Sequence, residues 1–374
     1  MEVTIENIAD VLPFVREDSG IIVSKRSDHT VIDYVYTTED MWDSDMALQC
    51  RGLKFDAEGK IIGRPFHKFF NIGEKQAPQD IAWDAPHIVL DKLDGSMVHP
   101  VYLNDELVFM TRKGATEHAK QAQSHAHASL LEFCVYCLGA NLTPMFEFTS
   151  PNNRIVVSYD HPELTLLAVR EMVSGRYLLY PEVQRLAQKF NVPLVQSLGA
   201  VEDFARFISD ARAKEEIEGY VVVFDDGHRL KLKTEHYSLR HSALASVTLE
   251  KNVLEWVLRG SVDDVAPLLA PKIAEMVRDY NDNVHAAITE REQEVVSFVD
   301  TYRELSRKDF AAKARAGLDP RLAGAAFAIL DDRPPRKLLI DNLLKAVGSI
   351  NKIDAMRDLY GFEWSLDGIT LPES

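Results

Sequence analysis

The segment DKLDGSMV, residues 91–98, places Lys92 between two aspartates and shortly before a glycine and a serine. A lysine amine becomes a nucleophile only when its pKa is lowered, and neighbouring cations or loss of contact with water lower it. Asp94 and Gly95 would then form a tight turn that holds the amine beside a phosphate. The same residues also fit an ordinary turn that carries an exposed lysine.

A second pair of lysines lies in RLKLK, where Lys231 and Lys233 are two residues apart on a predicted strand. This spacing puts both ammonium groups on one face of the strand. Two parallel ammonium groups repel each other unless an anion lies between them, and a phosphate-bearing ligand would supply that anion. The alternative is an exposed edge strand protected by lysines. Neither GxxxxGK[ST] nor GxGxxG is present, so lysines would have to bind phosphate without a glycine loop.

Two carboxylates could take part in the same chemistry. Glu147 lies in PMFEFTS with its side chain on the face opposite the two flanking phenylalanines, and Glu218 precedes an apolar strand in IEGYVVV. Carboxylates that face lysine pairs predict either structural ion pairs or an Mg²⁺–phosphate site, in which water completes the metal's shell.

The first 240 residues contain many short strands and a few helices, which predicts an α+β fold. GLKFDAEGKIIGRPF (52–66) and EGYVVVFDDGHRLKLK (218–233) predict hairpins, and RIVVSY (154–159) predicts a strand. From about residue 249 the pattern is helical almost throughout. We therefore expect two domains, 1–242 and 243–374.

The net charge of −16 excludes a generally basic surface, so a polyanionic partner would have to be attracted by a local group of cations. No run of 18 apolar residues and no signal peptide are present, which predicts a cytoplasmic protein. Cys134 and Cys137 form a CxxC within an apolar helical segment without a second pair, so we expect buried structural thiols. His125 and His127 have a spacing that does not converge on a metal.

Five signals follow one another in order: Arg51-Gly52, Lys92-x-Asp94-Gly95-Ser96, Phe146-Glu147-Phe148, Glu218-Gly219-Tyr220-Val221 and Lys231-x-Lys233. This order resembles the covalent nucleotidyltransferases, which comprise ATP-dependent DNA and RNA ligases and mRNA capping enzymes. ALQCRGLKF, RPFHKFFNIGE, FEFTSPNNRIVVSY and IEGYVVV are similar to the RNA ligase 1 family of T-even bacteriophages. HKFFN and PNNRIV favour an RNA ligase over the other members.

The resemblance implies a nucleotidyltransferase domain of antiparallel sheets with flanking helices, followed by an all-α domain that could recognise RNA. It implies that Lys92 becomes adenylylated. The residues implied in catalysis are Lys92, Lys113, Glu147, Lys231, Lys233 and Tyr237. Those implied to hold ATP are Tyr34, Arg51, Lys68, Phe70, Asp94, Gly95, Glu147, Glu218, Val221, Lys231 and Lys233. Those implied to bind metal are Glu147, Glu218 and Asp263. Leu93 departs from the family pattern, which has an acidic residue there.

The implied cofactors are ATP, from which AMP becomes attached to Lys92, and Mg²⁺ or Mn²⁺. The implied substrates are single-stranded RNA ends or a nicked tRNA-like molecule, handled in RNA repair by a monomer without a membrane or an obligate protein partner. A phage origin would place the protein in the host cytoplasm. The alternatives are a DNA ligase, a capping guanylyltransferase and a non-catalytic RNA-binding protein of the same fold. The first two append a β-barrel, against which the helical tail argues.

Overall fold

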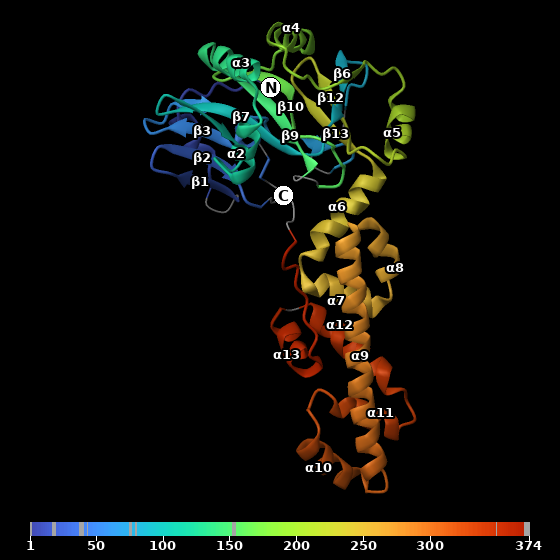
Figure 1. Ribbon diagram of the computed structural model, residues 1–374. Coiled ribbons are helices and arrows are strands. Elements are labelled where there is room, and N and C mark those ends of the chain that lie inside the picture. Colours follow the sequence, from blue (N-terminus) through green and yellow to red (C-terminus); the bar gives the residue numbers. More distant parts are fainter. Residues whose placement is uncertain are drawn as a thin grey trace. The chain divides into compact units, whose positions relative to one another are not determined.

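Period-two alternation in the first part of the chain produces antiparallel sheets, and the later part is helical (Figure 1). The computed structural model describes residues 2–16, 20–36, 41–42, 44–74, 77–78, 81–151, 155–348 and 350–369. The chain divides into two compact units, and the division falls between Ser238 and Leu239. The predicted α+β class is confirmed.

The first sheet of unit 1 has the order β1-β2-β3-β4, formed by Ile21–Lys25, His29–Tyr34, Leu53–Asp56 and Ile61–Gly63. Its buried side, which includes Ile32, Leu53 and Phe55, packs with two short 3₁₀ helices, η1 (Ile8–Asp10) and η2 (Leu12–Phe14). The short helix α1 (Asp45–Gln49) precedes β3, so Arg51 lies in the connection between them.

Two further sheets form the rest of unit 1. One has the order β10-β9-β7-β8, and its strands are Glu163–Glu171, Leu142–Thr149, Ser96–Leu103 and Glu106–Met110. The other has the order β11-β6-β12-β13-β5, and its strands are Ser197–Gly199, His87–Lys92, Gly219–Phe224, Arg229–Lys233 and Phe70–Asn71. Only the β13–β5 pair is parallel among the pairs described for these sheets.

Helices cover one face of each of these two sheets (Figure 1). Helices α2 (Glu117–Ser124), α3 (Ala128–Gly139) and α4 (Tyr180–Phe190) pack on the β7–β10 sheet around Phe133, Phe146 and Phe148. Helix α5 (Phe204–Arg212) packs on β12 and β13 around Phe204, Tyr220 and Leu230. The uncovered faces are therefore available for a site between the two sheets.

Unit 2 contains helices and no strand in its described residues. Helix α6 (Glu235–Val247) begins in unit 1 and is followed by α7 (Glu250–Arg259), α8 (Val262–Val265), η4 (Ala266–Leu268) and the long α9 (Pro271–Tyr302). Helices α10 (Arg307–Gly317), α11 (Ala323–Leu330), α12 (Pro335–Val347) and α13 (Ile350–Tyr360) follow. Helices α11, α12 and α13 pack against α9, which makes α9 the central helix of this unit.

Most of the predicted local elements form, with one exception. Both predicted hairpins are present, and Cys134 and Cys137 are buried thiols on α3. The predicted strand RIVVSY is wrong for its described part, since residues 155–159 form bends and coil. Residues 152–154 of the PNNRIV motif lie outside the described part of the chain. No described helix combines the length and the apolar composition that crossing a membrane requires.

Candidate active site

Strand register brings three distant motifs side by side. In the β6-β12-β13 ladder, Lys92 pairs with Gly219, and Gly219 pairs with Lys233. Directly paired residues of neighbouring strands place their side chains on the same face of the sheet, so Lys92 and Lys233 point the same way. Lys231 and Val221 are paired one step further along that face. The KxDG, EGYV and KxK motifs therefore lie next to one another on one face of this sheet.

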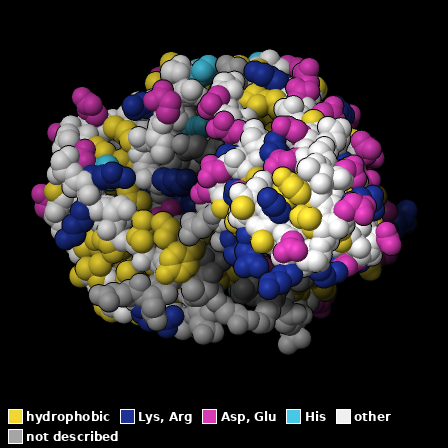
Figure 2. All heavy atoms as spheres, turned by 90° about the horizontal axis from the view of Figure 1, so that it is seen from below, with side chains coloured by type: hydrophobic (Ala, Val, Ile, Leu, Met, Phe, Trp, Pro, Cys, Tyr) yellow, Lys and Arg dark blue, Asp and Glu magenta, His cyan; other side chains and the backbone are white. Residues whose placement is uncertain are grey.

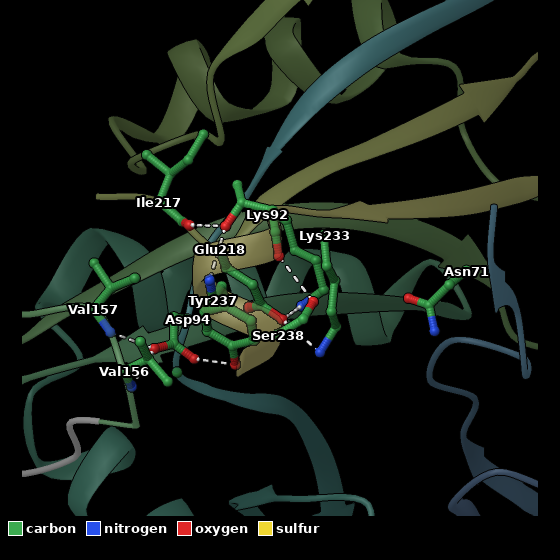
Figure 3. Close-up of polar contacts among 12 residues, drawn as sticks. Asn71, Lys92, Asp94, Val156, Val157, Ile217, Glu218, Lys233, Tyr237 and Ser238 are labelled. Atoms are coloured by element: carbon green, nitrogen blue, oxygen red, sulfur yellow. Dashed lines mark hydrogen bonds and ion pairs between the residues drawn. The ribbon is translucent and has the colours of Figure 1, made fainter. Parts of the chain in front are cut away.

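Glu218 forms ion pairs with both Lys92 and Lys233 (Figure 3). Its Oε1 lies 2.7 Å from Lys92 Nζ and 3.1 Å from Lys233 Nζ. The Glu218 side chain is 3% exposed, so the carboxylate is held by the two ammonium groups with little help from water. The sequence predicted carboxylates facing the lysines, either as structural ion pairs or as part of an Mg²⁺–phosphate site, and Glu218 forms such ion pairs with Lys92 and Lys233.

Asp94 of the KxDG motif is a buried anchor in this structure. Its Oδ2 accepts hydrogen bonds from the backbone N–H groups of Val156 and Val157, both at 2.7 Å, and its Oδ1 accepts one from the Tyr237 hydroxyl at 2.8 Å. Its own N–H donates to the Tyr159 hydroxyl at 2.9 Å. Since Asp94 is only 1% exposed and protein groups occupy both oxygens, its predicted contact with ATP is not supported here.

Tyr237 has the same anchoring character. Its side chain is buried, its hydroxyl donates to Asp94, and Lys233 Nζ lies 4.8 Å from its ring centre. Burial and the nearby carboxylates of Glu218 and Asp94 raise the pKa of this phenol, so it stays protonated and acts as a donor. Its predicted catalytic role remains a prediction, and the structure supplies a route by which it would orient the KxDG segment.

Gly95 allows β9 to approach the nucleophile's loop. A Cβ on Gly95 would lie 2.4 Å from the carbonyl oxygen of Phe148, a distance that side-chain carbons do not tolerate. The Gly95 N–H donates to Glu147 Oε1 at 3.0 Å, which places this carboxyl beside the KxDG loop. Burial raises the pKa of Glu147 to about 8, and the nearby ammonium of Lys92 opposes that shift only in part.

A cavity of about 250 Å³ lies between the two helix-backed sheets. Lys92, Lys231 and Val221 line it from one sheet, and Met97 and Glu147 line it from the other. Apolar side chains occupy much of the remaining wall together with two arginines; these lining residues are Arg51, Phe66, Phe69, Leu90, Asp91, Leu93, Gly95, Leu167, Val195 and Arg229. The combination of charged and apolar wall suits a ligand with a phosphate at one end and an aromatic ring at the other.

Lys231 is the most perturbed cation of this cavity. Burial, and then repulsion from Arg51, Lys92, Lys68 and Lys233, lowers its pKa to about 6. Its ammonium lies 4.6 Å from the centre of the Phe69 ring, and no carboxylate in the described chain forms an ion pair with it. A bound phosphate would supply the missing countercharge.

Several predicted nucleotide-binding residues lie outside this cavity. Lys68 and Phe70 line a neighbouring cavity of about 320 Å³, and Lys68 Nζ lies 5.1–5.7 Å from the ring centres of Tyr34, Trp42 and Phe70. Tyr34 packs against Trp42 and lines neither cavity. Phe70 faces the apolar side of the sheet, because it pairs with Leu230. The resemblance makes Phe70 or Tyr34 available to pack on the base or ribose of ATP; neither lines the cavity of Lys92, and this role stays a prediction.

Lys113 and Asp263 are likewise not among the residues that line the cavity. Lys113 is exposed in the turn that follows β8. Asp263 lies in the first turn of α8 in unit 2. Their predicted roles in ligation and metal binding stay predictions.

The described residues contain no cluster of three or more His, Cys, Asp or Glu side chains that could hold a metal. A protein-only cage is therefore not present in that part of the chain. Glu147 and Glu218 nevertheless suit Mg²⁺, which keeps several waters and is commonly bound by one or two carboxylates together with substrate phosphates. The raised pKa of Glu147 fits the same site, since a cation beside it would favour ionisation.

Sequence reasoning missed Arg229 and Tyr159. Arg229 lies two residues before Lys231 on β13, so the period of two that singled out the lysines also applied to it. No local signal pointed to Tyr159, because its hydroxyl meets Asp94 across 65 residues of chain.

The RNA ligase family model matches residues 49–237, about half of the chain, and this range includes all the predicted site residues except Tyr34 and Asp263. The chain therefore belongs to the RNA ligase family, and the predicted relationship to the phage enzymes and the predicted RNA ligase function are confirmed.

Individual relatives agree with this family. RNA ligase 1 of bacteriophage TS2126 is 28% identical over 248 residues, which cover 61% of this chain and 60% of the relative. The RNA ligase of Rhodothermus phage RM378 is 23% identical over 358 residues, which cover 77% of this chain and 80% of the relative.

Similarity to solved structures is more limited. A Naegleria gruberi RNA ligase mutant solved with ATP and Mn is 22% identical with a TM-score of 0.36, and the match covers 42% of this chain and 52% of that one. An archaeal ATP-dependent RNA ligase is 18% identical with a TM-score of 0.44, and the match covers 63% of each chain. Because both scores are low, the family assignment rests on the sequence match.

Proposed function

We propose that this chain is an RNA ligase (ATP) that joins a 5′-phosphate to a 3′-hydroxyl through a covalent AMP on Lys92. The observation that supports it most directly is the position of Lys92 on the wall of the cavity, where Lys231 lies on the same wall and Glu218 joins Lys92 to Lys233. A lysine that only stabilised a surface turn would have no reason to share a buried carboxylate with Lys233 of the KxK motif.

In the first step the Lys92 amine attacks the α-phosphorus of ATP. An N–P bond forms, the bond from that phosphorus to the bridging oxygen breaks, and pyrophosphate leaves with the electron pair. The amine must lose a proton, and Glu218, 2.7 Å away, is the nearest acceptor. In the second step the AMP passes to the 5′-phosphate of RNA, and in the third a 3′-hydroxyl displaces AMP.

Each step is a displacement at phosphorus, so catalysis depends on positioning and on neutralising charge. Lys231 and Arg51 provide positive charge on the cavity wall, and Val221 and Leu90 provide apolar surface for the base. Asp94, Tyr237 and Gly95 hold the KxDG loop in place. Mg²⁺ or Mn²⁺ near Glu147 and Glu218 would supply further positive charge to the phosphates.

The substrates proposed for this site are single-stranded RNA ends or the broken strand of a tRNA-like molecule. Net charge argues against broad electrostatic capture of RNA, because the chain carries −16 and the face in Figure 2 shows acidic and basic side chains interspersed. Binding would then depend on local cations such as Lys113 and on the helical unit. We further propose that the protein acts as a monomer.

The direct test is covalent labelling. The protein is incubated with α-labelled ATP or GTP and Mg²⁺, denatured and examined for label on the chain. We expect label from ATP only, its loss in Lys92→Ala, and its retention in Lys189→Ala, an exposed lysine on α4. Label from GTP would favour a capping enzyme, and no label would favour an RNA-binding protein. Sealing of 5′-phosphorylated single-stranded RNA and not DNA then tests the substrate.

A further inference from the structure

Arg229, the first residue of β13, is a buried cation without a counter-ion among the described residues. It is 6% exposed, and its Nε has no hydrogen-bond partner. Its guanidinium lies 5.1 Å from the ring centre of Phe66 and 4.3 Å from that of Tyr177, and it also hydrogen-bonds to Tyr177. Burial lowers its pKa to about 10, so the group remains charged at neutral pH.

Arg170, another buried arginine nearby, differs from Arg229 in its hydrogen bonds. The Arg170 guanidinium donates to the carbonyl oxygens of Gly175 and Pro65 and to Gln49 Oε1, at 2.6–2.8 Å. Those contacts satisfy all three of its nitrogens within the protein, as expected for a structural residue. Arg229 lacks such a set, and leaving a buried charged donor unsatisfied is costly. Its guanidinium therefore keeps N–H donors for a ligand in the two cavities that it lines.

Arg229 lies where the two cavities meet. It and Phe69 line both the cavity of Lys92 and the neighbouring cavity of Lys68. On β13 the residues Arg229, Lys231 and Lys233 share one face, spaced by about 7 Å. A row of cations thus runs from Lys233, which lies beside Lys92, to Arg229, which also lines the second cavity.

We propose that Arg229 binds the β- and γ-phosphates of the nucleotide and so holds the pyrophosphate that leaves when Lys92 is adenylylated. This rests on the proposed function. An in-line displacement places the leaving group on the side of the α-phosphorus away from the Lys92 amine. A triphosphate that extends along the row of cations reaches Arg229 and then Lys68. Lys68 could therefore contact ATP although it lies outside the cavity of Lys92.

The second cavity also contains the acidic side chains of Asp226 and Asp45. Asp226 lies 2.8 Å from His228 Nδ1, which also lines this cavity, and Asp45 begins α1. The planar guanidinium offers several parallel donors, which suit phosphate oxygens better than a single ammonium does. The alternative ligand for Arg229 is an acceptor atom of the adenine ring, and the experiment separates the two.

The test compares one reaction that uses pyrophosphate with another reaction that does not. In the first, lysyl-AMP enzyme is treated with pyrophosphate and the regeneration of ATP is followed. In the second, the free enzyme seals pre-adenylated RNA, which involves AMP and no pyrophosphate. For Arg229→Met we expect the half-saturating pyrophosphate concentration to rise ~10- to 100-fold, as for loss of a charged hydrogen bond. The KM and kcat for pre-adenylated RNA should stay within about twofold.

Two further variants complete the design. Arg206→Met, an exposed arginine on α5, is the matched control and should change neither reaction. Arg229→Lys keeps the positive charge but loses the parallel N–H donors of the guanidinium. It should therefore raise the half-saturating pyrophosphate concentration less than Arg229→Met does, again with little change in the sealing of pre-adenylated RNA. If Arg229→Met fails to fold and loses both reactions, the difference between the two reactions in Arg229→Lys tests the role of Arg229.

Three results would overturn the inference. Equal losses in both reactions for every folded Arg229 variant would mean a structural role. A higher KM for pre-adenylated RNA would mean that Arg229 contacts the AMP portion. An unchanged response to pyrophosphate would mean no contact with the leaving group. If wild-type protein forms no lysyl-AMP from ATP, the proposed function fails as well, which distinguishes that failure from the other three.

Discussion

Replacing Asp94 tests whether the KxDG aspartate anchors the loop or contacts the nucleotide. Asp94→Ala would leave the N–H groups of Val156 and Val157 and the hydroxyl of Tyr237 without their acceptor. Each unsatisfied buried group costs ~1–3 kcal/mol, so for three groups we expect a loss of about 3–9 kcal/mol in the free energy of unfolding of unit 1.

Asp94→Asn should be much milder. The amide oxygen can accept the two backbone N–H groups while its NH₂ faces the Tyr237 oxygen, so mainly the charge assistance is lost, about 1–2 kcal/mol. Tyr237→Phe removes one bond to Asp94 and should cost a similar amount. In a double-mutant cycle, Asp94→Asn and Tyr237→Phe should not be additive, because the two side chains are in direct contact.

Two assays read out these variants. Urea unfolding followed by circular dichroism gives the free energy, and hydrogen exchange of residues 155–159 reports on the local anchor. The adenylylation rate should fall in the same order as the stability, with the KM for ATP nearly unchanged in Asp94→Asn. The anchoring role would be refuted if Asp94→Asn raised the KM for ATP without altering exchange at Val156 and Val157.

The remaining predictions concern Gly95, Glu147 and Lys231. Gly95→Ala should slow adenylylation by at least tenfold, because its Cβ would lie 2.4 Å from Phe148 O, whereas Gly139→Ala, which meets nothing within 4 Å, should not. With a pKa of about 8, Glu147 is mostly protonated at pH 7, so the half-saturating Mg²⁺ concentration for adenylylation should fall as the pH rises toward 8. Glu147→Gln should remove this pH dependence, whereas Glu58→Gln, at an exposed turn, should keep it. With a pKa of about 6, Lys231 is mostly neutral at pH 7, so the protein should take up a proton when it binds ATP. Calorimetry in buffers of different ionisation heat measures this uptake, and Lys231→Met should bind ATP without it. In the unfolded chain Lys231 keeps its proton up to about pH 10.5, whereas in the folded protein it loses that proton near pH 6. The free energy of unfolding of the ligand-free protein should therefore increase as the pH rises from about 6. Urea unfolding should show that Lys231→Met lacks this increase.

The sequence by itself determined the chemical groups of this protein and their order along the chain. Lys92, Glu147, Glu218, Lys231 and Lys233 were identified from motifs whose spacing depends only on the two-residue period of a strand. The same periodicity predicted the hairpins and the change to a helical unit. These features are readable because they are local.

Tertiary structure decided how those groups meet. Whether Lys92 shares Glu218 with Lys233 depends on the register of β6 against the β12–β13 hairpin, which lies far from β6 in sequence. RIVVSY alternates like a strand, yet its N–H groups bond to Asp94, which lies about 60 residues earlier. Phe70 faces away from Lys92 because of its pairing with Leu230.

Burial likewise emerges only from the folded chain. The shifted pKa values of Glu147 and Lys231 come first from desolvation, which the surrounding sheets impose and no local pattern encodes. Arg229 shows the same limit, because the sequence displayed its charge but not its lack of a partner at the junction of two cavities. Local spacing therefore specifies which groups are present, whereas long-range pairing and exclusion of water specify what each group can do.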